Sequence, residues 1–168
     1  MYTISQHLLI YIIGFGVMTF GSHLYAQDSE LIGSVTLEEV VQNEKIFQIY
    51  IDRYQPNESA VKYLNSVQDS LKLIVFIGTW CRESKKYIPG LIKTIDAASS
   101  AQIRVDYIGV DAQKKSPESF LKTFEIKYIP TVVVLKGNKE IGRIEEAPQQ
   151  LIENDLVTII SEKAQIEN

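Results

Sequence analysis

The sequence predicts an α/β fold in which a central mixed sheet is flanked by helices. Residues 73–77 and 131–135 are continuous apolar runs, which are typical of strands buried on both faces. Segments with apolar residues at helical spacing lie around them, so the order of elements from Leu71 onward is β-α-β-α-β-β-α. The chain has 168 residues, of which 45% are hydrophobic and 23% charged, and this favours one globular domain.

The predicted elements begin before this sheet, in an N-terminal helical extension. Thr36 and Glu39 have the spacing of a capping box, so a short helix is expected to start there. Phe47, Tyr50 and Tyr54 recur at helical spacing, but isoleucines in the same run leave a strand possible. We expect these three aromatic side chains to pack in the core, and the alternative is a ligand site.

The segments that follow show either apolar residues at helical spacing or the apolar runs typical of buried strands. Ser116 is the expected N-cap of a helix with Pro117 at its first position. Gly137-Asn138 is expected to turn the strand at 131–135 back into a strand at 140–144. The other expected elements are helices at 60–67, 87–95 and 151–160 and a strand at 105–108.

The first 26 residues differ in character from the rest of the chain. They contain no Asp, Glu, Lys or Arg, and residues 8–20 form a mostly apolar run. This run is shorter than the ~20 residues that a membrane-spanning helix needs, and it fits a secretory signal peptide. We expect cleavage after Ala26 and export to the periplasm, with no membrane span in the mature chain. A retained membrane anchor and a buried helix are the alternatives.

This boundary gives the expected domain organisation. Residues 1–26 are the signal peptide, 27–70 an extension packed on the core, and 71–168 the core itself. Both histidines, His7 and His23, lie in the predicted signal peptide, and Cys81 is the only cysteine. The mature chain therefore lacks the residues for Ser-His-Asp or Cys-His catalysis and for an intramolecular disulfide. We expect no metal and no cofactor.

The charge distribution argues against a nucleic-acid partner. The formal net charge is −4 and the sequence contains no long basic run, whereas nucleic-acid-binding domains carry a basic patch. We expect the protein to be a monomer whose partners are proteins or low-molecular-weight thiols and disulfides.

The sharpest local feature is Trp80-Cys81, which follows a predicted strand and opens a predicted helix. Free amide groups and the positive dipole end of a helix N-terminus stabilise a thiolate. Arg82 and Lys85 would assist this stabilisation, and Glu83 would oppose it. The alternative interpretation of a lone cysteine is a small, inert, buried hydrophobic residue.

Several spaced motifs resemble the thioredoxin superfamily. Trp80-Cys81-x-x-Ser84 is similar to the Trp-Cys-x-x-Cys active site of that family, with serine at the second cysteine. Pro89, eight residues after Cys81, matches the proline of the active-site helix. Ile129-Pro130-Thr131 resembles the loop whose cis-proline packs against the active-site sulfur. The resemblance implies a thioredoxin fold over residues 71–163.

The resemblance also implies the roles of the site residues. The expected catalytic residues are Cys81, Ser84, Trp80 and Pro130, and the expected substrate-binding residues are Trp80, Ile129 and Thr131. Ser84 is expected either to donate a hydrogen bond to the thiolate or to lie on the helix surface.

Two departures from the family pattern decide the expected function. Serine at position 84 cannot resolve a mixed disulfide, and Val75 stands where the family has a buried aspartate. Cys81 is therefore expected to act by a monothiol mechanism, forming mixed disulfides with protein or small thiols. The alternative is a redox-inactive module that holds a partner polypeptide in a groove between Trp80 and Pro130.

Overall fold

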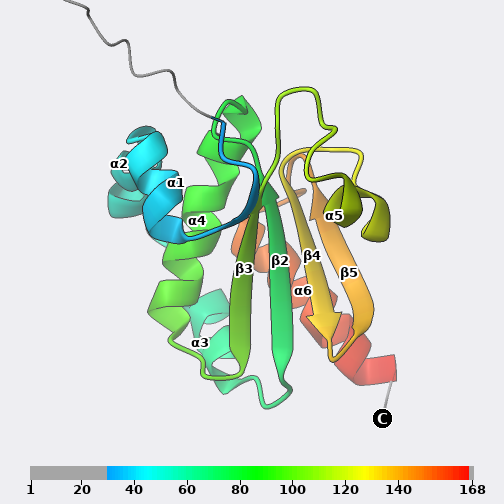
Figure 1. The fold of residues 1–168 in the computed structure, drawn as a ribbon. Coiled ribbons are helices and arrows are strands. Elements are labelled where there is room, and N and C mark those ends of the chain that lie inside the picture. The colour runs from blue at the N-terminus through cyan, green and yellow to red at the C-terminus, as the bar shows by residue number, and fades with distance from the viewer. Residues whose placement is uncertain (1–29, 167–168) are drawn as a thin grey trace, which may run out of the picture.

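The structure, a computed structural model, describes residues 30–166 as a five-stranded mixed sheet with helices on both faces (Figure 1). The strand order is β1-β3-β2-β4-β5. β2 and β3 are parallel, and every other neighbouring pair is antiparallel. The strands are β1 Gly33–Val35, β2 Leu71–Ile77, β3 Ile103–Gly109, β4 Thr131–Lys136 and β5 Lys139–Glu145. The predicted signal peptide lies outside the described residues.

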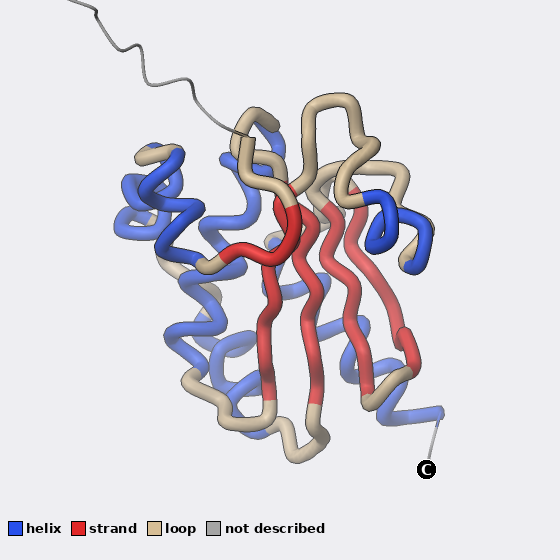
Figure 2. Tube along the Cα trace, viewed as in Figure 1, coloured by secondary structure: helices blue, strands red, loops and turns tan. Residues whose placement is uncertain are grey.

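The helices are divided unequally between the two faces of the sheet (Figures 1 and 2). α5 packs on one face, and α3, α4 and α6 pack on the other, with α1 and α2 beside α4. No helix within residues 30–166 combines the length and apolar character needed to cross a membrane. The helices are α1 Leu37–Asn43, α2 Ile46–Arg53, α3 Glu58–Ser66, α4 Arg82–Ala98, α5 Glu118–Thr123 and α6 Ile152–Ile166.

β2 is the central strand, and its sequence explains this position. Leu73 and Val75 belong to the hydrophobic cluster under α4 and α6, whereas Ile74 and Phe76 belong to the cluster under α5. Successive side chains of a strand point to opposite faces, so an unbroken apolar run fills both clusters. The predicted central sheet is confirmed, and its central strand places its carboxyl end directly before Trp80 and Cys81.

The N-terminal extension shares the core of the sheet. Val40, Phe47 and Leu64 are fully buried in the cluster that contains β2 residues. The predicted capping box is present, because Thr36 Oγ1 accepts a hydrogen bond from Glu39 N–H and the Glu39 carboxylate accepts one from Thr36 N–H. The ambiguous isoleucine-rich run is the helix α2, so the strand alternative is wrong.

Two local predictions need correction. The extension is not purely helical, because β1 pairs antiparallel with the edge of β3. Gly109 permits this approach, since a Cβ atom there would collide with the backbone of Leu31. Ser116 does not cap α5. Pro117 itself is the N-cap residue, and the Ser116 N–H instead donates to the carboxylate of Asp111.

Candidate active site around Cys81

The turn after β2 positions the cysteine. Cys81 N–H donates to Gly78 O over 3.0 Å, and Lys85 N–H donates to Cys81 O over 3.2 Å. Cys81 is the N-cap residue of α4, with extended backbone dihedrals and no side-chain capping bond. The thiol is therefore free to turn away from the helix and towards the loop before β4.

The Cys81 thiol has one proton and two oxygen acceptors within reach. Its Sγ lies 3.3 Å from Ile129 O and 3.7 Å from Glu83 Oε2. Only 6% of the residue is exposed, and it packs in the cluster under α5 with Ile129. The structure thus brings Cys81 and Ile129, both predicted site residues, into direct contact.

Glu83 is the charged neighbour of the thiol. A hydrogen bond from its own backbone N–H and a second one from Arg82 Nε at 3.1 Å hold the pKa of the Glu83 carboxyl below its usual value. At neutral pH this carboxylate is an anion, and its Oε2 is one of the two acceptors near the Cys81 thiol. An adjacent anion disfavours a thiolate, whereas the N-terminus of α4 favours one.

Trp80 covers the turn with its indole ring. Its Nε1 donates to Val110 O over 2.8 Å, which ties the ring to the chain after β3. A Cβ atom on Gly78 would lie 2.6 Å from Trp80 Cε2, so the ring needs glycine beneath it. Beside the buried cysteine, 38% of Trp80 remains exposed.

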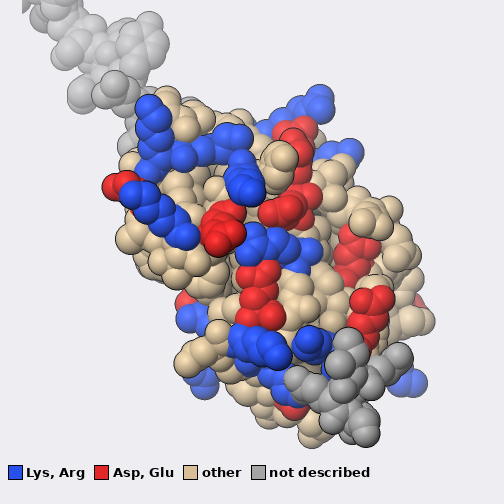
Figure 3. Space-filling view, turned by 90° about the vertical axis from the view of Figure 1, so that its right-hand side faces the viewer, with Lys and Arg blue, Asp and Glu red and all other residues tan. Residues whose placement is uncertain are grey.

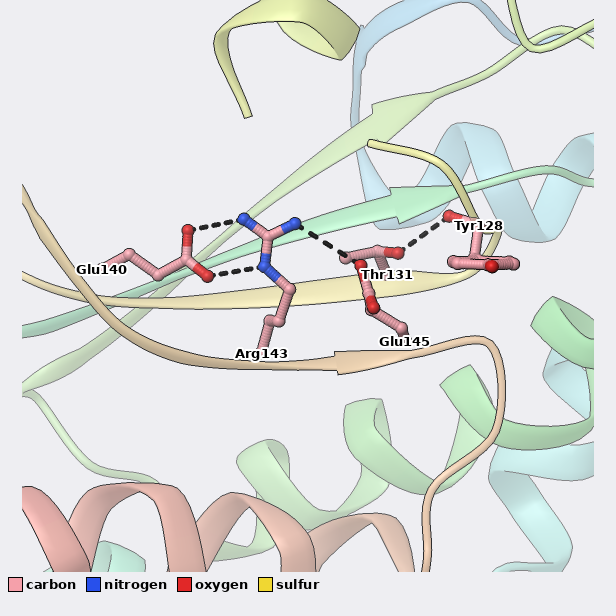
Figure 4. Close-up of polar contacts among 5 residues, drawn as sticks. All are labelled: Tyr128, Thr131, Glu140, Arg143 and Glu145. Atoms are coloured by element: carbon pink, nitrogen blue, oxygen red, sulfur yellow. Dashed lines mark hydrogen bonds and ion pairs between the residues drawn. The ribbon is translucent and has the colours of Figure 1, made fainter. Parts of the chain in front are cut away.

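The loop before β4 completes the site. Ile129 and Pro130 are buried, and the peptide bond between them is cis. Thr131 is fully buried, and its Oγ1 donates to Tyr128 O over 2.8 Å (Figure 4). The Thr131 side chain thus shapes the loop, and the prediction that Thr131 binds substrate stays a prediction.

Ser84 is fully buried one helical turn after Cys81. Its Oγ accepts a hydrogen bond from Gly78 N–H over 3.3 Å. The expectation of a surface serine is therefore wrong, because the side chain joins α4 to the end of β2. The two acceptors within reach of the thiol belong to Glu83 and Ile129.

A cleft of about 550 Å³ between α2 and α4 was not predicted from the sequence. It begins at Arg82, next to the candidate cysteine, and Tyr50 and Tyr54 line it. Tyr50 is 41% exposed, so of the three aromatic residues expected in the core only Phe47 is fully buried. The spacing of Arg82, Lys85 and Lys86 puts three cations on one face of α4, but it does not show that α2 lies beside them.

The fold and the site together define a thioredoxin-like protein. The thioredoxin family model matches residues 34–162, which is more than half of the chain. The chain belongs to the thioredoxin family. A search of curated proteins gave no match. Within the described residues, no cluster of three or more His, Cys, Asp or Glu side chains is arranged to bind a metal ion.

Solved structures share the fold at low sequence identity. An HIV epitope-scaffold is 16% identical, with a TM-score of 0.61 and coverage of 78% of this chain and 94% of its own. A Pseudomonas aeruginosa protein of unknown function is also 16% identical, with a TM-score of 0.55 and coverage of 75% and 84%. Thioredoxin f2 of Chlamydomonas reinhardtii is 20% identical, with a TM-score of 0.45 and coverage of 65% and 93%. Such identities show the fold alone.

Proposed function

We propose that this thioredoxin-like protein exchanges thiols and disulfides by a monothiol mechanism through Cys81. The observation that carries the proposal is the position of Sγ. It lies at the N-terminal end of α4, in hydrogen-bond contact with Ile129 O directly before Pro130. A partner chain that reaches Trp80 and this loop also reaches the sulfur. The sequence contains no second cysteine to compete for the mixed disulfide.

The proposed step conserves atoms and electrons. The Cys81 thiol loses its proton to solvent, and the thiolate attacks one sulfur of a partner disulfide. A bond forms between Cys81 and that sulfur, while the other partner sulfur leaves as a thiolate and takes up a proton. A second thiolate, from the partner or from a low-molecular-weight thiol, then attacks the mixed disulfide and releases Cys81. When the second thiolate belongs to the partner, the partner keeps the same number of disulfides and the reaction is isomerisation. When it belongs to a low-molecular-weight thiol, that thiol ends in a mixed disulfide with the partner, which gains one free thiol, and the reaction is exchange.

A refolding assay tests this proposal. We expect the protein to accelerate the reactivation of a disulfide-scrambled substrate such as ribonuclease A in a glutathione buffer. Cys81→Ala should lose the acceleration, and Ser66→Ala, at the end of α3, is the matched control and should keep it. Equal acceleration by wild type and Cys81→Ala would contradict the proposal.

The burial of Cys81 favours a second candidate function. With 6% of the residue exposed and a carboxylate beside the thiol, the site also suits a redox-inactive module that binds a partner polypeptide near Trp80 and Pro130. The two functions differ in one measurement. A reactive thiol is alkylated by iodoacetamide at pH 6, whereas a thiol that serves only in packing resists the reagent.

A further inference from the structure

The cleft between α2 and α4 is lined by other residues than the two that contact the thiol, Glu83 and Ile129. α2 contributes Tyr50 and Arg53, and the first turns of α4 contribute Arg82, Lys85 and Lys86. Pro89 and Ile46 add apolar surface to its lining. The cleft has a volume of about 550 Å³, within the range of ligand-binding clefts in general, and most of its lining residues carry charged or hydroxyl groups.

The charge of this cleft has one sign. Four of its lining residues are cations and none is an anion, although the whole chain has a net charge of −4. Two of the cations already have carboxylate neighbours, since Lys85 pairs with Glu44 at 2.7 Å and Arg82 with Glu83 at 3.1 Å. Arg53 and Lys86 are exposed, and Lys86 Nζ lies 4.7 Å from the centre of the Tyr87 ring. The cleft therefore presents two cations beyond those in its own ion pairs.

The spacing of the cations indicates the shape of the ligand. Along a helix the rise is 1.5 Å per residue, so Arg82 and Lys86 lie about 6 Å apart along the α4 axis. In an extended polypeptide, alternate residues lie on one face about 6.6 Å apart. Two acidic side chains at alternate positions of an extended segment therefore match the spacing of Arg82 and Lys86. α2 adds Arg53 to the lining of the same cleft.

We infer that this cleft binds an extended acidic segment of a partner polypeptide, with Asp or Glu at alternate positions. Lys86 and Arg82, the latter through the guanidinium N–H groups that Glu83 does not engage, bind two of its carboxylates. Arg53 adds a third cation from α2, and Tyr50 and Pro89 contact the apolar groups of the segment. Because Arg82 directly follows Cys81, a bound segment reaches the vicinity of the thiol. The inference does not rest on thiol exchange, since binding in the cleft requires no sulfur.

Peptide binding tests the inference. The probe is a fluorescein-labelled peptide in which Glu alternates with Thr, and its matched control replaces every Glu with Gln. Fluorescence anisotropy with the full chain should show binding of the Glu peptide that weakens with added salt, as expected for exposed charges. We expect Arg53→Gln and Lys86→Gln each to weaken binding about two- to fivefold, and Arg53→Glu to weaken it further.

Two control variants separate this site from general charge effects and from the thiol. Lys139→Glu changes the charge at the β4–β5 hairpin, outside the cleft, and should alter binding less than twofold (about the error of such a titration). Cys81→Ala should bind like wild type, and this result would stand even if the thiol-exchange assay failed. Circular dichroism of each variant checks that it is folded.

Four outcomes would overturn the inference. If the Gln peptide bound as tightly as the Glu peptide, the carboxylates would have no role in binding. If Lys139→Glu weakened binding as much as the cleft variants do, the effect would come from net charge alone. Displacement of the peptide by equimolar citrate would assign the cleft to small polycarboxylates. A concentration-dependent dimer that Arg53→Glu abolishes would assign it to a second copy of this chain.

Discussion

The carboxylate of Glu83 sets the charge beside the candidate thiol. Its Oε2 is one of the two acceptors near Cys81 Sγ, and its lowered pKa keeps it ionised at neutral pH. We therefore expect Glu83→Gln, which removes a negative charge from beside the sulfur, to increase the rate of Cys81 alkylation by iodoacetamide about two- to fivefold at pH 7.

Mass spectrometry of quenched time points measures that rate. Glu118→Gln is the matched control, because Glu118 also lies in the first turn of a helix, α5, and should leave the rate unchanged. A slower reaction in Glu83→Gln would show instead that the carboxylate promotes loss of the thiol proton.

In the resemblance to the thioredoxin active site, Ser84 stands where the family has its second cysteine. Ser84→Cys should create an internal dithiol and increase insulin disulfide reduction, measured by turbidity with dithiothreitol as reductant. The gain should be partial, because the fully buried Val75 supplies no carboxylate. The change also removes the acceptor for Gly78 N–H, at a cost to stability of about 1 kcal/mol. Cys81→Ala/Ser84→Cys is the control and should show no increase.

At the scale of elements, a buried polar contact joins the extension to the last helix. Glu153 of α6 is fully buried, and its carboxylate accepts hydrogen bonds from Tyr54 Oη at 2.7 Å and from Asn57 N–H at 2.9 Å. Lys85 and Glu44 make a second link, between α4 and the end of α1. Residues before β2 are thus bonded to α4 and α6, two of the three helices that follow it.

Tyr54→Phe tests the importance of the first link. Loss of the hydroxyl leaves a buried carboxylate with one fewer donor, so the free energy of unfolding should fall by about 1–3 kcal/mol. Urea denaturation followed by circular dichroism measures the change. Tyr50→Phe is the matched control, since Tyr50 is 41% exposed, and it should change stability by less than about 0.5 kcal/mol. Equal stability of the two variants would contradict this role of the hydroxyl.

The elements differ in how well the sequence predicts them. β2 and β4 were predicted because a strand buried on both faces needs an unbroken apolar run. β1 was not, because three residues are too few to show alternation, and its position depends on the neighbouring Gly109. The cap of α5 was also missed, because Asp111, in the preceding loop, takes the Ser116 N–H.

At the scale of the whole molecule, charge protects an exposed sheet edge. Figure 3 shows acidic and basic side chains interleaved on the side of the molecule that carries β5. On that strand Arg143 pairs with Glu140 at 2.6 Å and with Glu145 at 3.5 Å (Figure 4). Charged edge strands resist pairing with other chains. We expect a monomer in light scattering, and a stable dimer would contradict this expectation.

The raised pKa values of two tyrosines predict how the stability of the molecule depends on pH. Burial, followed by the contact with Glu153, raises the pKa of Tyr54 well above 10, and burial raises the pKa of Tyr107 to about 12. In the unfolded chain both lose their protons near pH 10, so above that pH the folded state holds more protons. The free energy of unfolding should therefore fall as pH rises from about 9 to 11.5. Tyr107→Phe should show a shallower fall in urea titrations, and an identical slope would contradict the assignment.

Part of the candidate site could be predicted from the sequence because it lies in short local motifs. These motifs contain Trp80, Cys81 and Pro130. The Glu83–thiol contact depends on a side-chain rotamer, and the burial of Ser84 depends on its bond to Gly78. The cleft joins residues from α2 and α4 that are about thirty positions apart in the sequence, and no local pattern relates them.

The single thiol has a consequence for stoichiometry. A dithiol protein can release its partner without help, but this sequence offers one thiol to one partner at a time. Under the proposed mechanism each covalent adduct is therefore one-to-one, and a thiol of the partner or of the solution has to release it. Maleimide dyes or spin labels added to the native chain would mark Cys81 alone, which makes the protein its own site-specific reporter for whatever docks beside it.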